Sequence, residues 1–91
     1  MYKIETTNRF EKDILLAKKQ KRGIAELAHV LNLLEKGEQI PEKYQNHKLK
    51  NIKPATWDLH VEPDWVLLYI KDDKNKIIKL VRIGSHSELF K

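Results

Sequence analysis

The spacing of hydrophobic residues divides the chain into a helical first half and a strand-forming second half. Apolar and polar residues alternate over residues 2–5, which predicts a short strand. Two helical stripes follow, one from Asn8 to the basic run that ends at Gly23, and one between Gly23 and Gly37. Cations at the end of the first stripe suit the negative end of a helix. We expect the two helices to form a hairpin.

After Pro54 the hydrophobic period changes from that of a helix to that of a strand. Residues 57–61 alternate, with apolar side chains on one face and polar ones on the other. Residues 66–70 are almost all apolar, as in a central strand, and residues 77–83 are rich in β-forming residues. Before Pro54, residues 38–54 have little periodicity and are expected to form a loop with room for a helical turn.

This order of elements predicts an α+β fold. It would contain an N-terminal strand, a two-helix hairpin and a three-stranded antiparallel meander, with the helices packed on one face of the sheet. Ninety-one residues suit one compact core and are too few for two. We therefore expect residues 1–91 to form a single domain.

The composition narrows the possible functions. Eighteen Lys and Arg against 13 Asp and Glu give a formal net charge of +5, which favours negatively charged partners such as nucleic acids or acidic proteins. The absence of cysteine excludes disulfides and thiolate zinc sites. The N-terminal residues lack the apolar core of a signal peptide, and no segment is long and apolar enough for a membrane span. We therefore expect a cytoplasmic protein with no membrane partner.

Titratable residues concentrate in residues 57–65, WDLHVEPDW. If the three strands pair in sequence, the turn that carries Asp64 lies at the end of the sheet where the last strand exits, and His86 follows that strand closely. His60 lies near the same edge on the polar face of its strand, and His47 can approach from the preceding loop. The sequence therefore predicts that His60, Asp64 and His86 can converge at one end of the sheet, with His47 able to approach them.

Several imidazoles and a carboxylate near a cation suit cleavage of an RNA phosphodiester by its own 2'-hydroxyl. One group removes the hydroxyl proton, another protonates the leaving 5'-oxygen, and a cation offsets the negative charge that develops on phosphorus. Imidazole suits both proton transfers because its unperturbed pKa, about 6.5, lies near neutral pH. Arg82 is the candidate cation, since its planar guanidinium matches phosphate oxygens. In a regular strand, however, Arg82 shares a face with Ile78 and Leu80.

Structural roles are also open for the same residues. His60 can solvate one face of the sheet, Asp64 can be an ordinary turn residue, and both tryptophans suit the core better than a base-stacking platform. Phe90, near the C-terminus, is less suited to a core and can stack on a base. The charged runs, which include Lys48, Lys50 and Lys53, can simply form solvent-exposed surface.

A metal site is the rival chemistry. Its ligands would be Asp58, His60, Asp64 and His86. Asp58 and His60 would share one face of a strand, but no compact motif of several histidines accompanies them. We therefore expect no metal and no other cofactor.

Three blocks of the sequence form a specific set: residues 47–49 (HKL), residues 58–65 (DLHVEPDW) and residues 82–90 (RIGSHSELF). The second and third blocks are the more specific, because they occur together in this order and at this separation. Through these blocks, and over nearly its whole length, the chain resembles the YafQ branch of the RelE/ParE superfamily of bacterial toxins.

The resemblance implies a RelE-like fold and a ribosome-dependent endoribonuclease that cuts messenger RNA and inhibits translation. A cognate antitoxin would hold it inactive in a type II toxin-antitoxin pair, and DNA would be bound only indirectly, through the antitoxin. The basic surface would contact ribosomal RNA, and the mechanism would need no metal. By position, the acid-base and positioning residues would be His47, His60, Asp64 and His86. The residues that shape the site or contact RNA would be Trp65, Phe90, Arg82, Lys48 and Lys50.

The chain departs from the family pattern at three positions. Asn46 stands where relatives often have Asp, and Asn51 where they often have Gly. The second change is mild, because Asn tolerates the left-handed backbone conformation better than most residues. Trp57 replaces a common Arg, which removes a cation close to the proposed site.

Two other functions remain open. A toxin of the same fold that resembles the ParE branch would act on a protein target without cutting RNA, although such a binder has no need for several imidazoles at one edge. A degenerate toxin would act only together with its antitoxin in repression, and it would show no toxicity when expressed alone.

Overall fold

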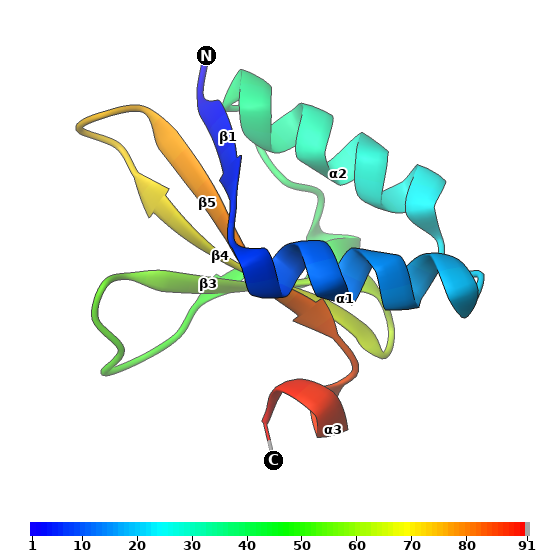
Figure 1. The fold of residues 1–91 in the computed structure, drawn as a ribbon. Coiled ribbons are helices and arrows are strands. Elements are labelled where there is room, and N and C mark those ends of the chain that lie inside the picture. Colours follow the sequence, from blue (N-terminus) through cyan, green and yellow to red (C-terminus); the bar gives the residue numbers. More distant parts are fainter. Residues whose placement is uncertain (91) are drawn as a thin grey trace.

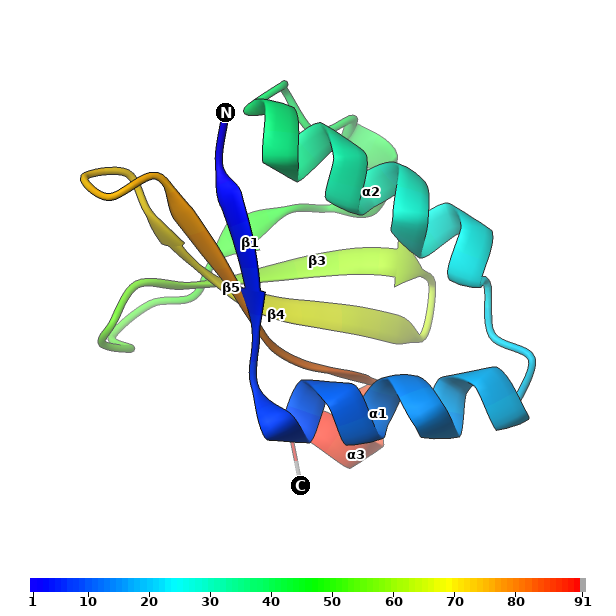
Figure 2. The same cartoon turned by 45° about the horizontal axis from the view of Figure 1, so that its top comes forward.

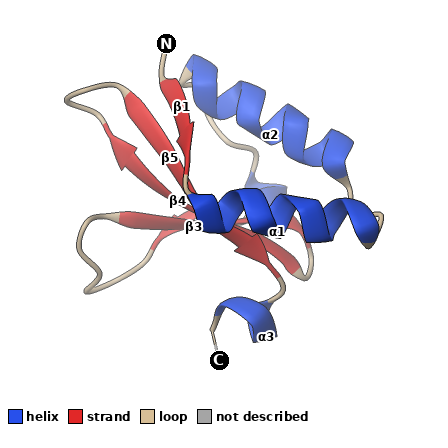
Figure 3. Cartoon of the chain, viewed as in Figure 1, coloured by secondary structure: helices blue, strands red, loops and turns tan. Residues whose placement is uncertain are grey.

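Two long helices cover one face of a twisted five-stranded sheet (Figures 1 and 2). The computed structural model describes residues 1–90. In chain order the elements are β1 (Lys3–Thr6), α1 (Asn8–Lys19), α2 (Ile24–Lys36), the 3-10 turn η1 (Glu42–Tyr44), β2 (His47–Lys48), β3 (Thr56–Glu62), β4 (Trp65–Asp72), β5 (Ile77–Gly84) and α3 (His86–Leu89). The expected α+β fold, with both helices of the hairpin on one sheet face, is confirmed (Figure 3).

The sheet contains two strands more than the predicted meander. The strand order is β1-β5-β4-β3-β2, and β3, β4 and β5 form the expected antiparallel meander. The N-terminal strand β1 joins this sheet parallel to β5, and β2 adds a short antiparallel pair to β3. The sequence analysis assigned the region of β2 to a loop, because two polar residues carry no hydrophobic period.

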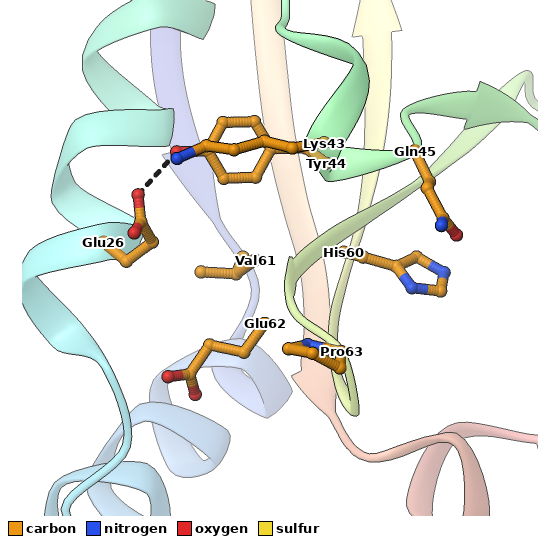
Figure 4. A pocket seen from close by; sticks show the side chains of 8 residues that line it. All are labelled: Glu26, Lys43, Tyr44, Gln45, His60, Val61, Glu62 and Pro63. Carbon is orange, nitrogen blue, oxygen red and sulfur yellow. Dashed lines mark hydrogen bonds between the residues drawn. The ribbon is translucent and has the colours of Figure 1, made fainter.

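Strand alternation and helix periodicity place the core between the sheet and the helices. Figure 4 shows the alternation directly, since Val61 and His60 point to opposite sides of β3. The left-handed backbone of Gly37, at φ +70°, ends α2 where the chain turns back towards the sheet. The core side chains are Phe10, Ala17, Leu27, Val30, Leu34, Tyr44, Leu59, Val61, Trp65, Leu67, Tyr69, Ile78, Leu80 and Ile83.

Asp13 of α1 closes part of the β5 edge that β1 does not cover. β1 pairs with β5 only from Ile77 to Leu80. Beyond that point, the Asp13 carboxylate accepts a hydrogen bond from the Ile83 backbone N–H at 3.1 Å. It also accepts two bonds from Arg82, from Nε at 3.1 Å and from Nη2 at 3.0 Å. One nearly buried carboxylate therefore fixes the end of β5 to α1.

A bulge in β5 changes the direction in which Arg82 points. The register pairs Leu68 with Arg82 but Tyr69 with Leu80, so Val81 is an extra residue on β5. Leu68 and Tyr69 lie on opposite faces of β4, and so do their partners. The expectation that Arg82 shares a face with Leu80 is therefore wrong.

We expect Asp13→Ala to lower the free energy of unfolding by roughly 2–4 kcal/mol, because it leaves the Arg82 guanidinium and a backbone N–H without their shared acceptor. Urea denaturation followed by circular dichroism measures the change. The matched control is Arg9→Ala, whose exposed guanidinium lies 3.9 Å from the same carboxylate and should contribute less than about 0.5 kcal/mol. Equal losses in the two variants would contradict this account.

Candidate active site

The β3–β4 turn and the start of α3 meet at one end of the sheet. Asp64 lies in that turn, and its Oδ1 accepts a hydrogen bond from the His86 backbone N–H at 3.1 Å. The same oxygen lies 3.0 Å from His86 Nδ1. Because a carboxylate only accepts, Nδ1 carries the hydrogen and Nε2 is left for other contacts. The expected convergence of these two residues is confirmed.

A capping box fixes α3 at this position. The Ser85 hydroxyl accepts a hydrogen bond from the Glu88 backbone N–H at 3.2 Å, and the Glu88 carboxylate accepts one from the Ser85 N–H at 2.7 Å. Ser85 follows directly after β5, so the short helix is tied to the last strand of the sheet. This arrangement presents His86 towards the neighbouring turn.

His60, His86 and Phe90 form a row of rings. The centroids of the His60 and His86 rings are 5.1 Å apart in an edge-to-face arrangement. The His86 and Phe90 rings follow at 5.9 Å. Phe90 is 48% exposed, as expected for an aromatic side chain that is free to stack on a ligand. The structure therefore brings together three of the sequence-predicted residues that come from β3 and the C-terminal segment.

Asp58 is a site residue that the sequence analysis assigned only to the rival metal site. The residue is 4% exposed, and its Oδ1 lies 3.2 Å from His60 Nε2. Within residues 1–90 this oxygen has no hydrogen bond of good geometry. A buried acceptor without a hydrogen bond costs about 1–3 kcal/mol. The Asp-x-His spacing on a strand was the available signal, because it places both side chains on one face.

His47 reaches the same face of the sheet from β2. It lies directly opposite Asp58 in the β2–β3 pair, so the two side chains share a face. The His47 Nδ1 lies 2.9 Å from the Gln45 carbonyl oxygen, which can only accept, so Nδ1 carries the hydrogen and Nε2 is free. The three candidate histidines thus each have one ring nitrogen beside an oxygen acceptor.

Arg82 and Trp65 are less accessible to RNA than the sequence suggested. Two guanidinium nitrogens of Arg82 are bonded to Asp13, and these hydrogen bonds raise the pKa of Arg82. Trp65 is 1% exposed and belongs to the core, so its ring supports the turn from within and does not offer a surface for a base. Lys48 and Lys50 are exposed, as an RNA contact requires.

Two of the three departures from the family pattern meet at Tyr69. The Trp57 and Tyr69 rings are stacked at 6.3 Å with an interplanar angle of 11°. The Tyr69 hydroxyl donates to the Asn46 side-chain oxygen at 2.6 Å. Because strands alternate, Trp57 lies on the opposite face of β3 from Asp58. The third departure, Asn51, has φ +58°, the left-handed conformation that Asn tolerates.

A pocket of about 460 Å³ opens beside His60 (Figure 4). It lies between α2, η1 and the end of β3. This part of β3 follows Trp57 and Asp58, the two residues that pair with β2. The Tyr44 hydroxyl donates to a Glu26 carboxylate oxygen, which lowers the pKa of Glu26 and raises that of Tyr44 to about 12. The pocket residues are Glu26, Lys43, Tyr44, Gln45, His60, Val61, Glu62 and Pro63.

The rival four-residue metal site is not assembled. Asp58 contacts His60 and Asp64 contacts His86, but these are two separate pairs. No cluster of three or more His, Asp or Glu side chains placed to hold a metal ion occurs among residues 1–90. The same part of the chain contains no helix with the length and apolar character needed to cross a bilayer.

Comparison with known proteins gives consistent results. The family model described as "Bacterial toxin of type II toxin-antitoxin system, YafQ" matches residues 2–91. The mRNA interferase toxin YafQ of Escherichia coli (strain B / BL21-DE3) is 35% identical over 88 residues, which cover 96% of this chain and 94% of that protein. The YafQ chain in a crystal structure of the E. coli DinJ-YafQ complex matches with a TM-score of 0.90 and 34% identity, over 100% of both chains. A metal-bound toxin from Helicobacter pylori matches with a TM-score of 0.93 and 34% identity, over 99% of this chain and 100% of that one.

The hydrogen bonds from His86 predict the titration of Asp64. The backbone N–H bond, followed by the side-chain bond, lowers the pKa of Asp64 below its ordinary value of 3.8. Since the folded-state pKa is the lower one, this contribution to stability is present above pH 3.8 and is lost as the pH falls through the depressed pKa.

We expect an NMR titration of the Asp64 carboxyl carbon to show a midpoint below 3.8. In the His86→Ala variant the midpoint should rise only part of the way back, because the backbone donor remains. An unchanged midpoint would mean that the His86 ring does not contact Asp64 in solution, and a full return to the ordinary value would mean that the backbone bond is absent.

Proposed function

This chain belongs to the YafQ family of bacterial toxins of type II toxin-antitoxin systems, and we propose that it is a ribosome-dependent endoribonuclease that cuts messenger RNA. The observation that carries the proposal is the meeting of two Asp-His contacts at one end of the sheet. Asp64 holds His86, Asp58 lies against His60, and the two imidazoles are 5.1 Å apart. An exposed aromatic ring, Phe90, lies next to the His86 ring.

The chemistry that this arrangement supports is attack of an RNA 2'-hydroxyl on the adjacent phosphorus. The new bond joins O2' to phosphorus while the bond from phosphorus to O5' breaks, so the products are a cyclic phosphate and a 5'-hydroxyl. One imidazole takes the 2'-hydroxyl proton, and a second, protonated imidazole donates to O5'. His47, His60 and His86 are the groups that can share these two roles, and Asp64 holds one of them in place.

Positive charge for the RNA phosphates comes from two sources in this proposal. Lys48, the second residue of β2, and Lys50, on the loop that follows it, are both exposed. Arg82 is a proposed phosphate contact through Nη1, since its other two nitrogens are bonded to Asp13. Cations close to the phosphate offset the negative charge that develops in the transition state. Trp65 is proposed to position the turn that carries Asp64, from its place in the core.

The partners follow from the same premise. We propose an antitoxin, by analogy with the relative whose structure is a DinJ-YafQ complex. With its net charge of +5, the chain suits an acidic antitoxin that covers the basic surface. Part of that antitoxin would fold on binding. DNA would be reached only through that antitoxin. Action on ribosomes would place the protein in the cytoplasm.

The test is 5'-end mapping of a defined messenger RNA incubated with the purified protein, with and without programmed ribosomes. We expect cuts only when ribosomes are present. His60→Ala and His86→Ala should each reduce the cleavage rate by at least about 100-fold, the size of a general acid or base contribution. The fourth histidine provides the matched control, since His29 is exposed on α2 outside the site and His29→Ala should keep the wild-type rate.

Two outcomes would reject this proposal. Full activity of both site variants would remove the histidines from the mechanism. Intact RNA in every reaction with folded wild-type protein would instead favour a toxin that acts on a protein target.

Charge reversal at Lys48 and Lys50 tests the RNA-binding role. We expect the double change to Glu to lower kcat/KM for ribosome-dependent cleavage by about tenfold, with a larger effect at low salt, because exposed charges act through a screened field. Initial rates at two salt concentrations measure this effect. Lys74→Glu, in the turn between β4 and β5, is the control. Because the double variant reverses two charges and the control reverses one, an equal loss per reversed charge would show that only net charge matters.

A further inference from the structure

We propose that Asp58 is a positioning residue that orients the His60 imidazole, an inference that rests on the proposed function and adds a residue to it. Asp58 and His60 are two residues apart on β3, so their side chains leave the strand on the same face. The Asp58 Oδ1 lies 3.2 Å from His60 Nε2. The pair is therefore formed within one strand, and it does not depend on a loop.

The burial of Asp58 favours one orientation and one tautomer of the His60 ring. At 4% exposed, Asp58 lies under its neighbours, and the oxygen nearest His60 has no aligned hydrogen bond within residues 1–90. An ionised carboxylate has only lone pairs to offer, so the His60 nitrogen beside it is best occupied by hydrogen. Rotation of the ring that aligns this N–H with Oδ1 would complete the hydrogen bond. Asp58 thus selects the neutral tautomer with hydrogen on Nε2, and Nδ1 is the nitrogen available to RNA.

The burial also separates the role of Asp58 from that of the catalytic groups. RNA cannot reach a carboxylate that lies between His47 on β2 and Leu68 on β4, its two cross-strand neighbours. Asp58 must therefore act through the imidazole that it contacts. Asp64, by contrast, is exposed and holds His86 through Nδ1. The two histidines would then offer opposite nitrogens, Nδ1 of His60 and Nε2 of His86.

The first measurement is the ¹⁵N chemical shifts of the His60 ring, from long-range ¹H–¹⁵N spectra of the free protein above the histidine titration range. We expect wild-type His60 to carry hydrogen on Nε2. In Asp58→Asn the amide NH₂ can donate to Nε2 and favour the other tautomer, so the shifts should move towards those of an Nδ1–H ring. A wild-type His60 with hydrogen on Nδ1 would overturn the proposal without any variant.

The second measurement is the cleavage rate in the ribosome assay. Asp58→Asn should lower kcat by at least about tenfold, as expected when an imidazole is held in the wrong tautomer, and should leave KM almost unchanged. The matched control is Asp73→Asn, which makes the same change of charge in the turn between β4 and β5 and keeps an acceptor for the Tyr2 hydroxyl. Wild-type kcat and unchanged ring shifts in Asp58→Asn would overturn the proposal.

The two measurements separate the possible failures. A lower kcat with unchanged His60 shifts would also overturn the positioning role, since Asp58 would then affect the rate without setting the His60 tautomer. If the wild-type protein cuts no RNA at all, the proposed function fails, while the ¹⁵N spectra still decide whether Asp58 sets the His60 tautomer.

Discussion

The carboxylate of Asp13 is the contact on which the geometry of the functional end depends. β1 stabilises only the first half of the β5 edge, and Asp13 supplies the acceptor for the next part of that edge. The strand segment held in this way leads directly into the capping box of α3 and so to His86. A group on α1, far from the site in sequence, thus determines where a catalytic candidate lies, because it fixes the strand end that carries it.

The antiparallel meander supplies the second half of the geometry. In this topology the β3–β4 turn and the exit of β5 lie at the same end of the sheet, and the register that pairs Val66 with Gly84 brings Asp64 next to the start of α3. Asp64 and His86 are 22 residues apart, yet their contact needs no long loop. The carboxylate also accepts a backbone N–H from α3, so the same residue orients the imidazole and secures the helix that bears it.

The features that local pattern decides were predictable from the sequence. Alternation and helical spacing identified the meander and the hairpin, and the order of the strands was enough to place Asp64 near His86. The missed features are those decided by tertiary context. The bulge at Val81 turns Arg82 to the other face. The sequence pattern does not reveal this extra residue, because the residues around it are mostly apolar. Trp65 is buried and Asp58 is enclosed because of what packs on them, which spacing along one strand cannot reveal.

The three site histidines share a design and differ in the group that holds them. A backbone carbonyl faces His47, a buried carboxylate faces His60, and an exposed carboxylate faces His86. The acceptor decides which ring nitrogen is free, Nε2 in His47 and His86 and Nδ1 in His60 in the proposed orientation. An RNA-cleaving site needs one imidazole that removes a proton and one that donates a proton, and each must direct its free nitrogen at a different oxygen of the RNA. Different acceptors on neighbouring strands let one sheet direct different ring nitrogens at the substrate, and here the strand pairing itself places His47 opposite Asp58, the residue that contacts His60.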